Sequence, residues 1–472
     1  MVLREQTYTN RQPRNGNPVL EKWPAAASSL RSLTFLTEAG EMGKRALVLA
    51  GILAVFIGGF LVGNRLMPVQ GQAVPGAGFA GVPGAKGGED VTGPYDAVAD
   101  WPKPLSQLPG HENWTWGAVE GIFAESPNRV FIAQRGEIPL LKRPMNSALP
   151  QIGPSLSFPT AEVPFRNASQ GPVASLPGGG APGDRPEDAD KLWGGRKGID
   201  ARWEHALVVV NASGDITEQW TQWDSFFKRP HAVYINPYDP EKNVWMVDDY
   251  KEALFKLSND GKKLLQTIGT PDQSGADASH FNRPTFITWL PDSTMFVADG
   301  YNGTRVAKFD KSGKFMLAWG QKGNPPTETR PGYFNVVHGI AADPVTHHVY
   351  VCDRGNRRIQ VFDENGKFLD QWPLDKNSSV NFLYLSADRH LWAADDRNAK
   401  VVEYDLDGHL LYAWGTLSDN PGGLFNIHGM SVDQDGNFYI AEVGNGRAQK
   451  FRPRQGADPS KLVGKPVYSA WK

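Results

Sequence analysis

The chain has 472 residues, a formal net charge of −2, 11% aromatic residues and a single cysteine. This length allows two or three ordinary domains or one large all-β unit, and 51 Gly with 36 Pro favours short strands and turns. The balanced charge, without long Lys/Arg runs, argues against a nucleic-acid partner. One cysteine excludes an intrachain disulfide framework and a thiolate metal cluster, so a metal ion would need nitrogen and oxygen ligands.

An uncharged apolar run begins at Ala46 and is just long enough to span a bilayer. Seven Lys or Arg residues precede it, so we expect a disordered cytoplasmic segment at 1–45 and a transmembrane anchor at 46–66. The alternative for 46–66 is the h-region of a signal peptide that starts at Met42 and is cleaved near Ala73. Both alternatives place the rest of the chain outside the cytoplasm, in the periplasm or the extracellular space. It would be anchored to the membrane through the helix, or secreted.

Residues 67–99 are rich in Gly, Ala and Pro and are expected to form a flexible linker to a body at 100–472. One β-rich unit recurs in this body. Its second strand ends in an acidic residue, and successive acidic positions are separated by 51, 54, 42 and 47 residues. Gly-containing hairpin turns follow in most copies. The acidic residues are Asp248, Asp299, Asp353, Asp395 and Glu442.

Four short antiparallel strands at this period are typical of a β-propeller blade. Five copies are clear, and a sixth is assembled from residues 117–134 and 206–220, on either side of a Pro- and Gly-rich insertion at 137–202. We therefore expect an all-β, six-bladed propeller, with seven blades as the alternative count. An insertion of this length is normally functional or disordered, and we expect it to overhang the mouth of the channel.

Histidine opens the first strand of alternate blades, as His231, His338 and His428. We number the blades in chain order, so the split copy is blade one. Blades three and five carry Thr285 and the neighbourhood of Phe382 at the equivalent place. Innermost strands line the channel of a propeller, and alternate blades of six are about 120° apart, so three imidazoles would converge on the axis. Three nitrogens with an open fourth position are the layout of a catalytic zinc.

A histidine at a blade start can also simply cap a turn, but strict alternation favours a shared ligand role. The other seven histidines show no such relation, and we expect them to be surface or turn residues. They are His111, His205, His280, His347, His348, His390 and His409.

Charged and phenolic residues are predicted near the same end of the channel. Tyr301 follows the second strand of blade three, Arg354 that of blade four and Arg135 that of blade one. A tyrosine hydroxyl ordinarily has a pKa near 10, and it acts as a base near neutral pH only where cations stabilise the phenolate. Two arginines beside Tyr301 would supply that setting, although Asp-Arg turns also serve structural pairing in propellers. The recurring aspartates are assigned to structure.

Several motifs in one order resemble the peptidylglycine amidating lyase family of NHL-type propellers. The likeness covers about residues 100–453. The motifs are Arg135-Gly-Glu, Arg-Pro-His231, His280-Phe-Asn-Arg-Pro-Thr, Asp-Gly-Tyr301, Phe-Asn-Val-Val-His338 with Asp-Arg354, and Phe-Asn-Ile-His428.

The resemblance implies that His231, His338 and His428 bind Zn²⁺ and that Tyr301 is the base, assisted by Arg135 and Arg354. The implied reaction converts a peptidyl α-hydroxyglycine into a peptide amide and glyoxylate. This substrate would come from a separate monooxygenase, because no such domain is recognised in this chain.

The sequence also departs from the family. The family's calcium ligand is an Asp after the third histidine, which is Gly429 here, so calcium binding is left open. The disulfides of the animal enzymes cannot form with one cysteine. Two other functions stay open. One is a non-catalytic NHL propeller that binds a protein or an envelope polymer, and the other is a gluconolactonase-type metal-dependent hydrolase. Hydrolases of that type use carboxylate and Asn ligands, so three aligned histidines count against it.

Overall fold

The computed structural model describes residues 91–140, 202–324 and 328–467. They belong to one compact unit, Gly78–Lys472. The expected cytoplasmic segment 1–45, the anchor 46–66 and most of the linker 67–99 and of the insertion 137–202 lie outside the described residues. Within the described ranges, no helix is long and apolar enough to cross a membrane.

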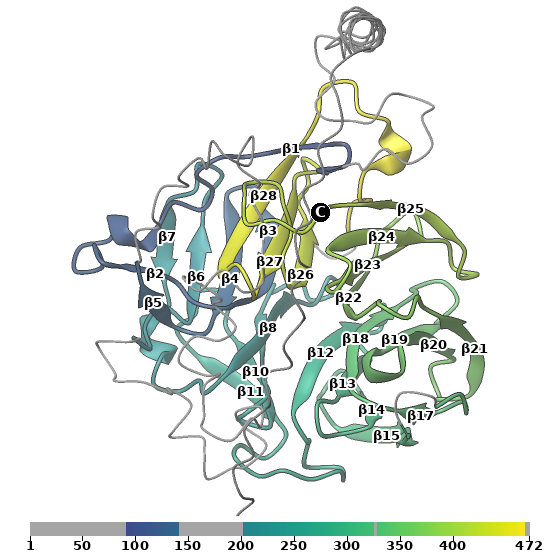
Figure 1. Ribbon diagram of the computed structural model, residues 1–472. Coiled ribbons are helices and arrows are strands. Elements are labelled where there is room, and N and C mark those ends of the chain that lie inside the picture. Colours follow the sequence, from purple (N-terminus) through teal and green to yellow (C-terminus); the bar gives the residue numbers. More distant parts are fainter. Residues whose placement is uncertain (1–90, 141–201, 325–327, 468–472) are drawn as a thin grey trace, which may run out of the picture. The chain divides into compact units, whose positions relative to one another are not determined.

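Six four-stranded antiparallel sheets form the six blades of a propeller, which confirms the predicted fold and blade count (Figure 1). Blade one contains β3 (Val119–Ser126), β4 (Arg129–Gln134), β6 (Leu207–Val210) and β7 (Ile216–Gln219). Blade two contains β8 (Pro230–Ile235), β9 (Val244–Asp248), β10 (Ala253–Leu257) and β11 (Leu264–Ile268). Blade three contains β12 (Pro284–Trp289), β13 (Met295–Asp299), β14 (Arg305–Phe309) and β15 (Phe315–Trp319).

The remaining blades follow the same order from the innermost to the outermost strand. Blade four contains β18 (Val337–Ala342), β19 (Val349–Asp353), β20 (Arg358–Phe362) and β21 (Phe368–Pro373). Blade five contains β22 (Val380–Leu385), β23 (Leu391–Asp395), β24 (Lys400–Tyr404) and β25 (Leu410–Trp414). Blade six contains β26 (Ile427–Val432), β27 (Phe438–Glu442), β28 (Arg447–Pro453) and β1 (Tyr95–Ala97).

The outermost strand of blade six comes from the N-terminal side of the body and closes the ring. β1 pairs with β28, with Tyr95 opposite Pro453. The Tyr95 ring is fully buried and lies within 5.8 Å of the Trp414 ring and 5.6 Å of the Phe438 ring, centroid to centroid. The propeller therefore begins before residue 100, where we expected the linker to end. A three-residue strand has no alternation long enough to mark it in the sequence.

Short elements complete the described structure. Two-stranded sheets pair β2 (Trp114–Trp116) with β5 (Glu137–Pro139), and β16 (Gln321–Lys322) with β17 (Tyr333–Phe334). The described helical turns are η1 (Leu105–Gln107), η5 (Thr221–Trp223), η6 (Arg354–Asn356) and η7 (Pro459–Lys461).

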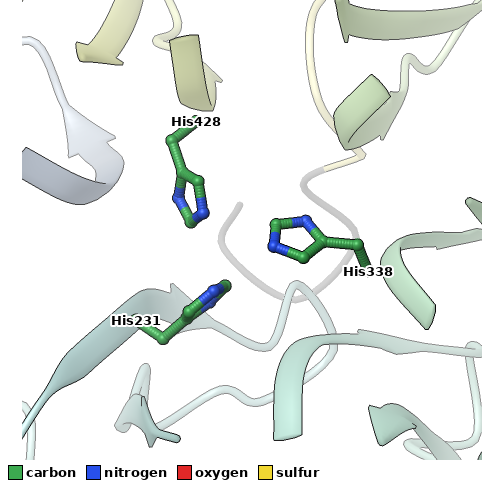
Figure 2. Close-up of side chains that lie close together, drawn as sticks. All are labelled: His231, His338 and His428. Carbon is green, nitrogen blue, oxygen red and sulfur yellow. The ribbon is translucent and has the colours of Figure 1, made fainter. Parts of the chain in front are cut away.

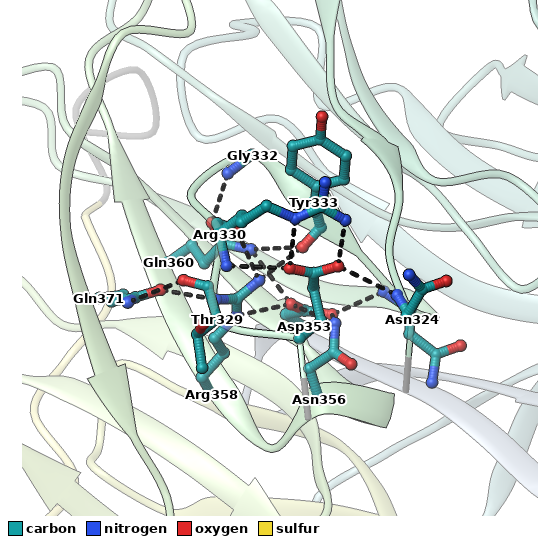
Figure 3. Close-up of polar contacts among 12 residues, drawn as sticks. Asn324, Thr329, Arg330, Gly332, Tyr333, Asp353, Asn356, Arg358, Gln360 and Gln371 are labelled. Carbon is teal, nitrogen blue, oxygen red and sulfur yellow. Dashed lines mark hydrogen bonds and ion pairs between the residues drawn. The ribbon is translucent and has the colours of Figure 1, made fainter. Parts of the chain in front are cut away.

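The recurring aspartates have structural roles within their own blades, as predicted. The Asp353 carboxylate is fully buried and accepts a hydrogen bond from Arg358 Nε at 2.8 Å. Arg358 Nη2 in turn donates to the Tyr333 carbonyl at 2.6 Å, so the second strand of the blade is tied to the segment that enters it (Figure 3). Asp299 receives the same contact from Arg305 at 2.7 Å. Cys352 is fully buried, and burial raises the pKa of its thiol, which suits the expected packing role.

Candidate metal centre

Each innermost strand carries a register shift near its start, where it has one residue more than the second strand. In blade two, Pro230 pairs with Asp248 and Ala232 with Val247, so His231 is the extra residue. A β-bulge of this kind redirects a side chain. The same shift occurs at the start of all six innermost strands, and it encloses Glu120, His231, Thr285, His338, Asn381 and His428.

The three histidines of this ring converge on the axis of the propeller (Figure 2). One donor atom of each lies within 4.8 Å of the others, and all three side chains are buried. Ring centroids are 5.1 Å apart for His231 and His338, 4.6 Å for His231 and His428, and 5.2 Å for His338 and His428. The structure thus brings together the three residues predicted from the alternation. In blade five the equivalent residue is Asn381 rather than Phe382, because the shift falls between Val380 and Phe382.

Residues of the intervening blades hold two of the imidazoles. Nδ1 of His338 lies 2.6 Å from the Asn381 carbonyl, and Nδ1 of His428 lies 2.8 Å from the Glu120 carbonyl. A carbonyl can only accept, so Nδ1 carries the proton and Nε2 keeps its lone pair. Nε2 of His428 is buried and has no hydrogen-bond partner among the residues that the structure describes. Such outer hydrogen bonds are usual for histidines that bind metal ions, and a buried lone pair without a partner suits a cation.

Burial and nearby positive charge keep these imidazoles neutral. Burial lowers the pKa of His231 and of His338 well below the ordinary value, and neighbouring guanidinium groups lower it further. Burial, together with Arg135 and Arg354, lowers the pKa of His428 to about 3. Neutral imidazole is the form that binds metal ions. The three histidines could therefore hold a metal ion, and their nitrogen donors fit zinc.

Tyr301 lies on this cluster. Its hydroxyl is 3.0 Å from Nε2 of His231 and 3.1 Å from Nε2 of His338. Gly300 allows the turn to approach blade four, because a Cβ there would lie 1.8 Å from the Val337 carbonyl oxygen. The predicted phenol and two of the predicted ligands are thus in direct contact.

Both predicted arginines lie near this tyrosine. The Arg354 guanidinium lies 5.1 Å from the centre of the Tyr301 ring, and its Nη1 donates to Asn381 Oδ1 at 3.1 Å. Arg135 forms an ion pair of 2.7 Å with Glu120, and within the described part of the chain its buried Nε and Nη2 have no hydrogen-bond partner. A cavity of about 390 Å³ is lined by both arginines, Tyr301 and His428. Its lining also contains Arg229 and Glu120.

Sequence reasoning missed a second group of charged side chains near the Tyr301 ring. Arg283 and Arg229 lie 4.4 Å and 5.6 Å from the Tyr301 ring centre. The fully buried Asp249 pairs with both, at 2.8 Å to Arg283 and 3.0 Å to Arg229. Glu120 was also missed, and burial raises the pKa of its carboxyl to about 7. The Arg-Pro dipeptides before His231 and Thr285 were the available signal, since they place Arg229 and Arg283 at equivalent positions.

Two of the histidines expected to be surface or turn residues are buried. His111 is 8% exposed and His205 is 3% exposed, and both contact the buried carboxylate of Glu137. They lie 94 residues apart in sequence, on opposite sides of the insertion, so no spacing rule connects them.

Comparisons with known proteins agree with this architecture. The sequence profile of the NHL repeat matches residues 334–362. Peptidyl-glycine alpha-amidating monooxygenase A of Xenopus laevis is 34% identical over 268 residues, which are 55% of this chain and 28% of that protein. Peptidyl-alpha-hydroxyglycine alpha-amidating lyase 1 of Drosophila melanogaster is 28% identical over 277 residues, 54% of this chain and 50% of that protein.

A third relative matches over more of its length. NHL repeat-containing protein 3 of Mus musculus is 31% identical over 263 residues, 50% of this chain and 71% of that protein. The matched part of the chain spans half or less of the length of the two amidating relatives. The chain belongs to the family of NHL-repeat proteins, and it is similar in sequence to the peptidyl-α-hydroxyglycine α-amidating lyases.

Proposed function

We propose that this protein is a zinc-dependent lyase that cleaves a peptidyl α-hydroxyglycine, or a similar carbinolamide, into an amide and glyoxylate. The observation that carries the proposal is the contact of the Tyr301 hydroxyl with two imidazoles of the axial cluster. A proton acceptor and an electrophilic metal ion would then act on one substrate group. The names of the amidating relatives support the same reaction class.

His231, His338 and His428 would hold the zinc ion, and a zinc ion held there would act as a Lewis acid on a substrate oxygen. The carbonyls of Asn381 and Glu120 orient two of these imidazoles by accepting from Nδ1.

Tyr301 would act as the general base in its phenolate form. It would take the proton of the α-hydroxyl group as that oxygen forms the C=O bond of glyoxylate. The C–N bond breaks in the same process, and its electron pair passes to the amide nitrogen. That nitrogen is protonated to give the primary amide, so the proton taken by Tyr301 balances the proton gained by the product.

The arginines would stabilise the negative charges of this reaction. Arg354 and Arg283 lie against the Tyr301 ring, where their positive charges would act on negative charge that develops during the reaction. Arg135 lines the cavity, and a substrate that ends in a carboxylate would supply acceptors for its Nε and Nη2, which have no hydrogen-bond partner among the described residues.

The setting of the reaction is also a proposal. A carbinolamide is made by hydroxylation of a glycine Cα, so we propose that a separate monooxygenase supplies the substrate. We further propose that the propeller works outside the cytoplasm, tethered through residues 46–66 or released by cleavage near Ala73. Support for this location comes from the apolar run and its basic flank.

The test is turnover of N-benzoyl-α-hydroxyglycine by the zinc-loaded protein, followed as glyoxylate and benzamide. Equal amounts of both products support the proposal. A protein that binds zinc but releases neither product would overturn it. Such a result would favour a non-catalytic NHL propeller that binds a protein or an envelope polymer. Hydrolysis of gluconolactone, assayed in parallel, would instead favour the hydrolase.

A further inference from the structure

A second cluster of imidazoles and carboxylates lies where the 137–202 insertion leaves and rejoins blade one. Glu137 begins β5, and Glu204 and His205 precede β6, while His111 comes from the segment before β2. The Glu137 amide donates to the Arg202 carbonyl at 2.7 Å, and the Arg202 amide donates to the Glu137 carbonyl at 2.9 Å. The two ends of the insertion are therefore held side by side at this cluster.

One buried carboxylate orients both imidazoles. Glu137 is fully buried, and its two oxygens lie 2.8 Å from Nδ1 of His111 and 2.6 Å from Nδ1 of His205. The two rings are 4.8 Å apart between centroids, at an interplanar angle of 70°. A carboxylate that accepts from Nδ1–H of a histidine is the usual outer partner of a metal-binding imidazole. Nε2 of His205 contacts Gln219 Oε1 at 2.9 Å, and a bound ion would replace this contact.

The cluster has an excess of negative charge. Glu137 and Asp224 both act electrostatically on His205, and Glu204 acts on Asp224. Arg202 supplies one positive charge and pairs with Glu204 at 3.0 Å. Three acidic side chains, Glu137, Glu204 and Asp224, therefore gather around a single guanidinium group, and such an arrangement attracts a divalent cation.

We infer that His111, His205 and Glu204 bind a divalent transition-metal ion such as Zn²⁺, separate from the axial cluster. One donor atom of each lies within 4.8 Å of the others, as in the axial cluster. Two imidazoles and a carboxylate are a donor set that zinc accepts. The Glu204 side chain is 42% exposed, which leaves it room to turn from Arg202 towards the ion. The bound ion would fix the two ends of the insertion to the segment that carries His111.

Zinc stoichiometry tests this inference. The full chain is stripped with a chelator, reloaded with Zn²⁺ at neutral pH, desalted and analysed for metal. The wild type should retain two zinc ions per chain, and His205→Ala and His338→Ala should each retain one. The double variant should retain none. His409→Ala, at an exposed histidine, should retain two.

A milder variant guards against misfolding. Glu204→Gln changes a partly exposed side chain and should lower the affinity for the second zinc ion at least tenfold. Glu112→Gln, in the same region, is the matched control. Added zinc should also raise the Tm of His338→Ala, and this increase should disappear when His205→Ala is combined with it.

Retention of one zinc by the wild type, lost in His338→Ala and unchanged in His205→Ala, would overturn the inference while leaving the proposed function intact. The opposite pattern, one zinc lost in His205→Ala and unchanged in His338→Ala, would support the inference and contradict the proposed function.

Discussion

The hydroxyl of Tyr301 lies 3.0 Å from Nε2 of His231, although the two residues belong to different blades and are 70 positions apart. This contact joins a turn of blade three to the innermost strand of blade two. It places the hydroxyl of the proposed base directly on the candidate metal ligands, and the predictions on activity follow from it.

Replacement of Tyr301 by Phe should remove the base and keep the ring among its arginines. General-base catalysis contributes about 10²- to 10⁴-fold to a rate, so kcat for glyoxylate release should fall by that order. Zinc content should not change, because the three histidines remain. A kcat within a few-fold of the wild type would exclude Tyr301 as the base.

Replacement of Asp249 by Asn should disturb the two arginines that lie against the Tyr301 ring. The change leaves Arg229 and Arg283 buried without their shared carboxylate, and breaking a buried ion pair costs roughly 3–5 kcal/mol. Urea unfolding should show that loss, and kcat should fall because two guanidinium groups are no longer fixed against the Tyr301 ring. Asp260→Asn, at an exposed turn, is the control and should change neither quantity. Unchanged stability in Asp249→Asn would contradict the buried network.

The metal-free protein should lose stability as the pH falls below about 6.5. His428 has a pKa of about 3 in the folded state against an ordinary value of 6.5, so between these values the unfolded chain binds the extra proton. Stability therefore rises with pH across this window, by up to about 1.4 kcal/mol per pH unit for one group. Urea unfolding at pH 7, 6 and 5 should show a steeper dependence in the wild type than in His428→Gln. Equal slopes would argue against a buried neutral imidazole.

The closing strand gives a prediction that is independent of catalysis. Tyr95→Ala should cost about 3–5 kcal/mol, because it empties a fully buried aromatic position in blade six. Tyr95→Phe keeps the ring and removes only the acceptor for the Val463 amide, a contact of 2.8 Å, so it should cost about 1–3 kcal/mol. If both variants unfold at the wild-type urea concentration, β1 does not close the ring.

The sequence predicted what the repeat encodes. The acidic strand ends, the hairpin turns and the alternating histidines each recur, so blade count and the convergence of His231, His338 and His428 followed from alignment alone. Tyr301 and Arg354 were also accessible, because they occupy equivalent turns of neighbouring blades.

Features that do not recur could not be found in this way. β1 has three residues, and its partner strand lies more than 350 positions later. Glu120 and Asn381 occupy the same bulge position as the histidines, but nothing in their residue types reveals that their backbone carbonyls orient imidazoles. His111 and His205 meet only because the ends of the insertion are paired in space.

The most direct test measures zinc content and glyoxylate release on the same preparations of wild type and His338→Ala. The account predicts that the wild type releases glyoxylate and benzamide in equal amounts and loses this activity when zinc is removed. His338→Ala should bind one zinc ion fewer and release no glyoxylate. Glyoxylate release by His338→Ala at the wild-type rate would contradict the central claim.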